Sequence, residues 1–114
     1  MDDCLFCKMA NGAIPVPKVF ENDTVFVIKD INPQAPYHFL AIPRAHYPGI
    51  HDVPPDETTL FADLFAALRA VVQNEGIDKK GYRLVINSGS SAGQSVDHIH
   101  VHLLSGRRLH WPPG

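Results

Sequence analysis

The sequence lacks long apolar runs, an excess of positive charge and enough cysteine for a disulfide framework. No apolar stretch approaches the ~20 residues that a membrane-spanning helix requires. The formal net charge is −2 with histidines neutral, which argues against a nucleic-acid-binding surface or a polybasic membrane patch. Residues 1–4 are acidic on balance and have neither the basic region nor the apolar core of a signal peptide. We therefore expect a cytoplasmic protein that binds neither nucleic acid nor membrane.

The 114 residues fit one compact domain, spanning 1–114, and leave no room for a second. An apolar stripe at helical spacing predicts one long helix between Pro55 and Gly76. A short N-terminal helix is expected over residues 4–10, ended by Asn11-Gly12. Strands are predicted at residues 19–21, 24–28, 38–42, 82–87 and 96–104. The simplest assembly is an α+β fold, in which the long helix covers one face of a five-stranded antiparallel sheet.

Histidine is abundant, with seven in so short a chain. Five of them lie in apolar, strand-like surroundings: His38, His46, His98, His100 and His102. Side chains alternate between the two faces of a strand, so the last three would point the same way, about 6.5–7 Å apart along it. The residues between them, Ile99 and Val101, would then point into the core.

This row of imidazoles has three possible interpretations. It is a metal site, a nucleophilic site in which a neutral imidazole attacks phosphorus or carbon, or a set of surface histidines on a half-exposed strand. The preceding loop, residues 87–96, is rich in glycine and serine, and its backbone N–H groups can form an anion-binding concavity. A phosphate-binding loop that leads directly into the histidines favours the nucleophile.

The two cysteines, Cys4 and Cys7, are too close together to staple a fold. Their spacing is that of half a tetrahedral zinc site, which needs two more ligands. The alternative is a pair of reduced thiols on a short helix. A thioredoxin-like redox role is less favoured, because no matching strand precedes Cys4.

At residues 94–102 the chain reads Gln-Ser-Val-Asp-His-Ile-His-Val-His, which resembles the signature of the histidine triad (HIT) family. Supporting matches are Asp30-Ile31-Asn32-Pro33-Gln34-Ala35-Pro36, residues 38–46 and Asn87. The ending, residues 107–114 with Trp111-Pro112-Pro113-Gly114, resembles the Hint branch, the purine nucleoside phosphoramidases. The resemblance extends over nearly the whole chain.

The resemblance implies a homodimer that binds purine nucleoside monophosphate derivatives and hydrolyses the P–N bond of adenosine phosphoramidates through a nucleotidyl-histidine intermediate. His100 would be the nucleophile, Ser95 would assist the leaving amine, and His38 and His98 would complete the histidine cluster. His102 and Asn87 would contact the phosphate, and Asp30 would hold the ribose hydroxyls. The other nucleotide contacts would be Leu5, Phe6, Ile14, Ile31, Gly93, Gln94 and Trp111. Each apolar member of this set has a plain alternative as ordinary core.

The same resemblance implies that catalysis needs no cofactor. Some family members, chiefly bacterial ones, bind a structural zinc with such a cysteine pair and two histidines, here Cys4, Cys7, His46 and His98. Two other functions stay open: a nucleotide-binding regulatory or scaffold protein with incidental hydrolysis, and a dinucleoside polyphosphate hydrolase as in the Fhit branch. The Trp-Pro-Pro-Gly ending disfavours the latter.

Overall fold

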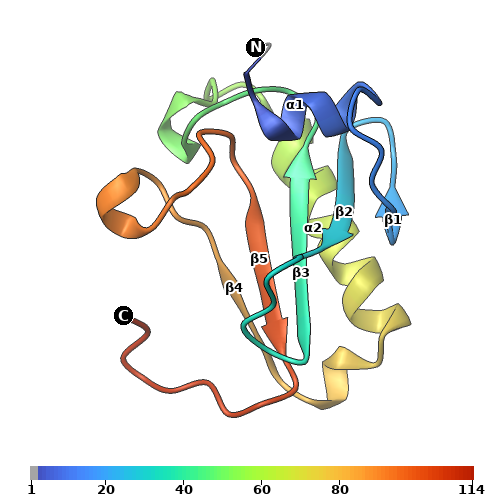
Figure 1. Cartoon of the computed structure of the whole chain (residues 1–114), viewed down its shortest axis with the longest axis vertical. Helices are drawn as coiled ribbons and strands as arrows, with labels where there is room; N and C mark the ends of the chain where they lie inside the picture. The colour runs from blue at the N-terminus through green and yellow to red at the C-terminus, as the bar shows by residue number, and fades with distance from the viewer. Residues whose placement is uncertain (1–2) are drawn as a thin grey trace.

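A five-stranded antiparallel sheet forms the centre of the computed structural model, which describes residues 3–114 (Figure 1). The strands lie in the order β1-β2-β3-β5-β4. Met1 and Asp2 lie outside the described residues. The strands are β1 (Phe20–Glu21), β2 (Val25–Lys29), β3 (Tyr37–Pro43), β4 (Tyr82–Val85) and β5 (Val101–Ser105); the helices are α1 (Leu5–Ala10) and α2 (Thr58–Asn74), with short 3-10 turns at η1 (Ile50–Asp52), η2 (Ile77–Lys79) and η3 (Ser90–Ala92).

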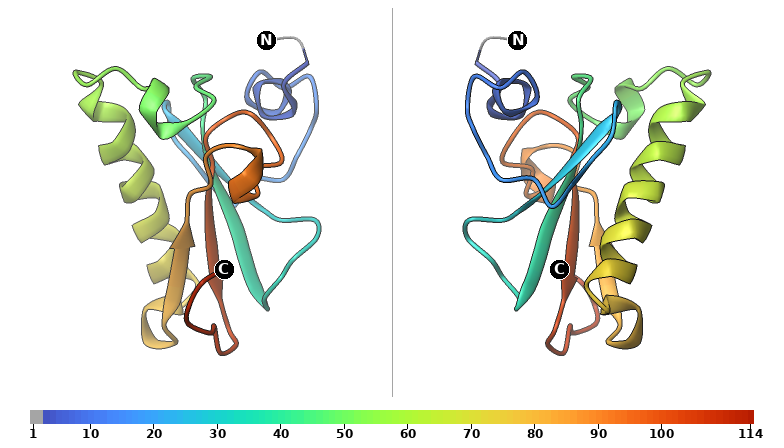
Figure 2. Two further views of the ribbon diagram at one scale, coloured as in Figure 1. Left: turned by 90° about the vertical axis from the view of Figure 1, so that its left-hand side faces the viewer. Right: turned by 90° about the vertical axis from the view of Figure 1, so that its right-hand side faces the viewer.

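The two faces of the sheet are covered differently (Figure 2). The long helix α2 packs along one face and buries a core that includes Leu64, Leu68 and Val101. On the other face α1 and the segment after it cover only one end, around Phe6, Phe26 and Ile28. The rest of that second face is left to loops, and the candidate site lies there. The α+β fold predicted from the sequence is confirmed.

The long helix occupies Thr58–Asn74, within the span predicted between Pro55 and Gly76. Its first residue is Thr58, because Glu57 is the N-cap and its side chain accepts a hydrogen bond from the backbone N–H of Leu60 at 3.3 Å. It stops at Asn74, before Gly76, whose φ of 68° is left-handed. One stripe residue, Phe65, is 50% exposed rather than buried. Within residues 3–114 no helix has the length and apolar character needed to span a membrane.

The fifth strand begins at Val101, five residues later than predicted. Pairing with β3 ends at Ala41↔Val101; to continue it would place Ile99 opposite Pro43, which has no amide hydrogen to donate. Instead the N–H of Ile99 bonds to the carbonyl of Tyr47 at 2.8 Å. The expectation of three histidines in a row on one strand is therefore wrong: of the three, only His102 belongs to β5.

Gly106 directly follows β5 and packs closely against Pro36 in the loop before β3. Its φ is +98°, and an added Cβ would lie 2.9 Å from Pro36 Cβ, whereas one at Gly12, with φ +84°, would meet nothing within 4 Å. We expect Gly106→Ala to lower the free energy of unfolding by about 3 kcal/mol, and Gly12→Ala by only about 1 kcal/mol. Urea unfolding at one protein concentration measures both. Equal losses in the two variants would show that Pro36 does not press on this glycine.

Candidate functional site

A cavity of about 230 Å³ opens on the face of the sheet opposite α2. One wall is apolar and comes from α1, the segment after it, β2 and β3: Leu5, Phe6, Met9, Val16, Ile28 and Leu40. The facing wall is polar. It comes from Asp30, directly after β2, and from the histidine segment, residues 95–102, which supplies Ser95, His100 and His102. An apolar pocket with a few convergent polar groups is the usual form of a small-molecule site.

His100 presents an unprotonated nitrogen to this cavity. Its Nδ1 lies 2.8 Å from the backbone carbonyl oxygen of His98. A carbonyl oxygen only accepts hydrogen bonds, so Nδ1 carries the ring proton and Nε2 keeps a free lone pair. The ring is 4% exposed and meets the Phe6 ring edge-on at 5.0 Å between centroids. These contacts fix both the tautomer and the orientation of the imidazole.

His102 has the opposite tautomer, and a chain of hydrogen bonds sets it. The backbone N–H of Gln34 donates to His38 Nδ1 at 3.0 Å, so His38 carries its proton on Nε2. That Nε2 lies 2.9 Å from His102 Nδ1, which must accept, and 3.3 Å from a carboxylate oxygen of Asp30. His102 therefore carries its proton on Nε2. His100 therefore presents a lone pair to the cavity, whereas His102 presents an N–H.

The imidazoles of His38 and His102 both favour their neutral form. Burial, followed by the neighbouring His100 and His38, lowers the pKa of His102 to about 4, although the Asp30 carboxylate opposes the shift. Burial also lowers the pKa of His38, against the opposing effect of Asp30. At neutral pH His102 is uncharged, so it acts as a hydrogen-bond donor rather than as a cation.

Cys4, Cys7, His46 and His98 form a second cluster, beside the first turn of α1, with one ligand atom from each within 4.8 Å of the others. The two Nδ1 atoms are 3.2 Å apart, and the Sγ-to-Nδ1 distances that involve His98 are 3.3 Å and 3.6 Å. A tetrahedral zinc with ordinary bond lengths sets its nitrogens about 3.3 Å apart and its sulfur and nitrogen about 3.6 Å apart. His98 Nε2 donates to the carbonyl of Pro43 at 2.7 Å, so its Nδ1 offers a lone pair to the cluster. These residues fit a zinc ion.

The thiols of this cluster also favour a cation among them. Burial, together with a hydrogen bond and charge repulsion from Cys4, raises the pKa of the Cys7 thiol. Two adjacent thiolates are costly alone, and a divalent metal offsets their repulsion. His46, which closes the cluster from the segment after β3, lies 3.4 Å from Cys7 Sγ through its Nδ1.

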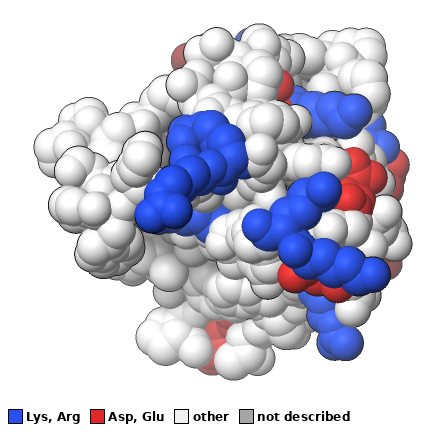
Figure 3. Space-filling view, turned by 90° about the horizontal axis from the view of Figure 1, so that it is seen from below, with Lys and Arg blue, Asp and Glu red and all other residues white. Residues whose placement is uncertain are grey.

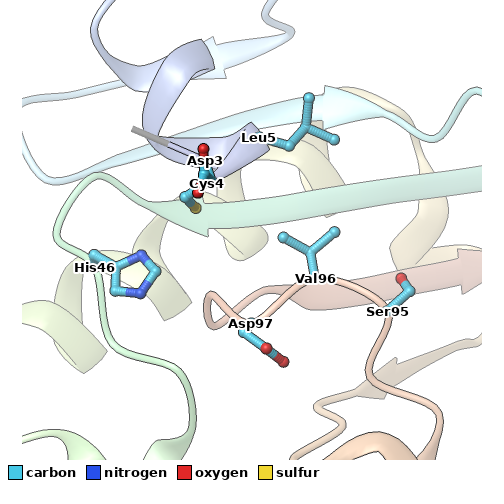
Figure 4. Close-up of a pocket in the computed structure, with 7 residues that line it drawn as sticks. All are labelled: Asp3, Cys4, Leu5, His46, Ser95, Val96 and Asp97. Carbon is cyan, nitrogen blue, oxygen red and sulfur yellow. The ribbon is translucent and has the colours of Figure 1, made fainter. Parts of the chain in front are cut away.

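Beside this cluster lies a larger cavity, of about 710 Å³ (Figure 4). Asp3, Cys4 and Leu5 at the start of α1 line one side, and residues 95–97 line the other. It adjoins the smaller cavity at Leu5, Ser95 and Val96 but does not include His100 or His102 among its lining residues. The larger cavity is therefore not the candidate reaction site, because neither histidine lines it.

The structure does not bring every expected nucleotide contact into the small cavity. Ile14 does not line it, and Trp111 is 80% exposed and lies outside it. Ile31 lines its rim but is 99% exposed. Gln94 uses its side chain to brace the loop: it accepts from Gly89 N at 2.7 Å and donates to the Pro48 carbonyl at 2.6 Å.

Two further expected contacts, Gly93 and Asn87, are not among the residues that line the cavity. Gly93, with φ +96°, ends η3 in that loop. Asn87 lies on the far side of His102, in an adjoining groove. The sequence interpretation missed Met9 and Val16, although Met9 follows Leu5 by one helical turn and that spacing was available as a signal.

The sequence and the fold of this chain are similar to those of known proteins. Residues 11–109 match the HIT domain model. An uncharacterized HIT-like protein of Synechococcus elongatus is 39% identical over 113 residues, which cover 99% of this chain and 98% of the relative. The crystal structure of a HIT family hydrolase from Legionella pneumophila aligns with a TM-score of 0.93 at 48% identity, over 98% of this chain and 100% of that one.

A more distant solved structure carries a functional description. It is a histidine triad nucleotide-binding protein from Candida albicans, 31% identical, with a TM-score of 0.83 over 96% of this chain and 83% of that chain. The domain match covers most of the chain, and the relatives above align along almost all of it. This chain belongs to the HIT domain family.

Proposed function

We propose that this protein is a nucleotide hydrolase that cleaves the P–N bond of purine nucleoside 5′-phosphoramidates through a nucleotidyl intermediate on His100. The observation that carries the proposal is the free lone pair on His100 Nε2 next to the N–H on His102 Nε2. Similar solved proteins described as HIT family hydrolases and as a nucleotide-binding protein support the reaction class.

The nucleoside occupies the apolar cavity in this proposal. Phe6, Ile28 and Leu40 surround the base, and the Asp30 carboxylate, at the cavity edge, accepts from the ribose hydroxyls. The phosphate then lies at the histidine end, where His102 Nε2–H, Asn87 and the backbone of residues 89–95 donate to its oxygens. Donors fixed in place before the reaction stabilise the charge that develops on those oxygens in the transition state.

The reaction proceeds in two displacements at phosphorus. The lone pair of His100 Nε2 attacks, the P–N bond breaks, and its electron pair leaves with the amine, which takes the hydroxyl proton of Ser95. The Nδ1–H of His100 remains bonded to the His98 carbonyl, which stabilises the positive charge of the nucleotidyl-imidazole. Water then attacks phosphorus and returns a proton to Ser95, and the second P–N bond breaks to release the nucleoside monophosphate and free His100.

We further propose a homodimer formed through the β4 edge of the sheet, on the same face as α2. β4 is an edge strand of the sheet, and its Tyr82 and Leu84 are 48% and 37% exposed. Phe65 of α2 lies beside them and lines the same shallow cavity. An edge strand with exposed apolar neighbours is a template for pairing with another chain.

We also propose that the Cys4, Cys7, His46 and His98 cluster holds a structural zinc. The metal supplies charge neutralisation and a cross-link between α1, the segment after β3 and the histidine segment. Because His98 also provides the carbonyl that orients His100, the same residue connects the metal cluster to the nucleophile.

The nucleophile is tested by His100→Ala. Loss of the only group that forms the covalent bond is expected to lower kcat for adenosine phosphoramidate by at least about a thousandfold, or about 4 kcal/mol. AMP binding should change little, because the apolar cavity and Asp30 remain. Steady-state kinetics and calorimetric AMP titration give the two values, with exposed His51→Ala as the matched control.

If His100→Ala keeps more than roughly a tenth of the wild-type kcat, a loss under about 1.4 kcal/mol, His100 is not the nucleophile. A wild-type protein that binds AMP but turns over no phosphoramidate would instead support a nucleotide-binding module.

The zinc is tested by elemental analysis of protein made in zinc-supplemented medium. We expect up to one zinc per chain, and expect Cys4→Ser with Cys7→Ser to remove it and lower Tm, because metal binding is part of the folding free energy. Exposed Ser90→Ala is a matched surface control. Metal-free wild-type protein whose Tm equals that of the double variant would show the cysteines to be bystanders.

The dimer is tested by Leu84→Glu, which places a charge in the exposed face of β4. We expect this variant to sediment as a monomer at concentrations where the wild type sediments as a dimer, because burying an unpaired carboxylate is unfavourable. Sedimentation at several concentrations measures it, with exposed Ala66→Glu on α2 for comparison. A wild type that stays monomeric throughout would contradict the proposed interface.

A further inference from the structure

Two residues of the apolar cavity wall lie between the two cysteines in the sequence. Cys4 is the N-cap of α1, Cys7 lies in its first turn, and the residues between them are Leu5 and Phe6, which both line the cavity. The Phe6 ring also meets the His100 ring at 5.0 Å between centroids. A change in the distance between the two sulfurs therefore acts directly on the wall beside the proposed nucleophile.

We propose that Cys4 and Cys7 are an oxidisable pair, which a peroxide converts to a disulfide that opens the metal cluster and weakens nucleotide binding in the apolar cavity. The modification is stoichiometric and is reversed by a thiol. It differs from thioredoxin-like catalysis, because the protein itself is the molecule oxidised. It does not depend on hydrolysis, since its effects are a covalent change, a loss of metal and a loss of binding affinity.

The chemistry requires one hydrogen peroxide per chain. The Cys4 sulfur attacks the O–O bond and becomes a sulfenic acid, while the second oxygen leaves as water. The Cys7 sulfur then attacks the Cys4 sulfur, the S–S bond forms, and the sulfenic oxygen leaves as another water. Two electrons pass from the sulfurs to the peroxide. The two protons that complete the waters come from the thiols, or from solvent where the sulfurs are bound to a metal.

Cys4 is the sulfur that the oxidant reaches first. It lines the larger cavity beside α1, of about 710 Å³, whereas Cys7 is not among the lining residues of either cavity (Figure 4). Cys7 is nevertheless next to it: its backbone N–H donates to Cys4 Sγ at 3.4 Å, and the two sulfurs lie within 4.8 Å of each other. An accessible sulfur with a second one beside it is the arrangement in which a sulfenic acid condenses to a disulfide.

The charge around the larger cavity favours a neutral oxidant. Asp3 and Asp97 line this cavity, and no lysine or arginine does. Basic side chains are prominent instead at the opposite end of the molecule, which is seen from below in Figure 3. Negative surroundings repel an anion such as glutathione disulfide but do not repel hydrogen peroxide. The oxidant that fits this cavity is therefore a small neutral peroxide.

Closing the disulfide moves the first turn of α1. Side chains three residues apart on a helix have Cβ atoms about 5–6 Å apart, whereas a disulfide requires about 3.5–4.5 Å. The backbone of Leu5 and Phe6 has to shift to close that gap, because both residues lie inside the ring that the disulfide completes. The apolar wall is then displaced from the position in which it surrounds the base.

The disulfide also removes both sulfur ligands from the metal cluster. Cys4 Sγ lies 3.3 Å from His98 Nδ1, and Cys7 Sγ lies 3.4 Å from His46 Nδ1. A thiolate binds zinc, whereas the sulfurs of a disulfide carry no charge to offer it. Only the two imidazoles remain, so oxidation releases the ion.

Intact mass, free thiols and released zinc measure the modification in the wild-type protein. The chain has only two cysteines, so a product lighter by two hydrogens without a disulfide between chains identifies the Cys4–Cys7 bond. We expect hydrogen peroxide to give this product and release the zinc, and dithiothreitol to reverse it. Oxidation of Met9, which also lines the apolar cavity, adds oxygen instead and is not reversed by dithiothreitol. Protein that keeps both thiols, or only gains oxygen, would overturn the proposal.

The effect on the cavity is measured by calorimetric titration with AMP. The oxidised wild type should bind AMP about tenfold more weakly than the reduced protein, a loss of about 1.4 kcal/mol, and dithiothreitol should restore the affinity. Peroxide should leave the affinity of the Cys4→Ser, Cys7→Ser variant unchanged, which makes that variant the matched control. Equal AMP affinity of the oxidised and reduced wild type would overturn the link between the cysteines and the cavity.

Histidine ¹H–¹⁵N NMR without ligand separates failure of this proposal from failure of the others. Oxidation should shift the signals of His98 and His100, because the Phe6 ring lies against both, but not those of exposed His51. Unchanged His100 signals once the disulfide has formed would contradict a displaced wall. Reduced protein that binds no AMP would contradict only the nucleotide site, and metal-free wild type only the zinc, while the mass and NMR results still decide the disulfide.

Discussion

The hydrogen bond from His100 Nδ1 to the carbonyl oxygen of His98, 2.8 Å long, is the contact on which the rest of the site depends. It exists because the chain leaves the sheet before β5 and turns at residues 96–98. In a regular strand that carbonyl would point sideways to a neighbouring strand and the imidazole would stand away from the sheet. His98 is held in turn by the Pro43 carbonyl through Nε2, and its Nδ1 faces the two cysteines. One residue, His98, therefore orients the proposed nucleophile and contributes to the candidate zinc cluster.

The same principle, a backbone group that decides a side-chain tautomer, recurs at His102. The N–H of Gln34 acts through His38 to leave the proton of His102 on the nitrogen that faces the cavity. Gln34 lies in the loop between β2 and β3, and its carbonyl also accepts from Arg107. The loop thus carries both the N–H that sets the His102 tautomer and a carbonyl acceptor for Arg107. His102 lies between the apolar cavity and the adjoining groove, since it lines both.

Much of this arrangement could be predicted from residue patterns, and the failures have a common cause. Period-3.6 and period-2 patterns located α2 and the sheet, and the histidine spacing identified the site. The pairing of Cys4 and Cys7 with His46 and His98 followed from the family resemblance, and the geometry agrees with it. What failed was the assumption that periodicity continues: Pro43 ends the pairing opposite residue 99, an effect of a residue distant in sequence.

His100 and His102 present opposite tautomers to one cavity. Long-range ¹H–¹⁵N NMR of protein labelled with ¹⁵N-histidine, at pH 7 and without ligand, tests it directly, with each ring assigned from His100→Gln and His102→Gln variants. We expect His100 to carry its proton on Nδ1 and His102 to carry its proton on Nε2. A spectrum in which His100 is protonated on Nε2, or in which His102 is a charged imidazolium at that pH, would contradict it.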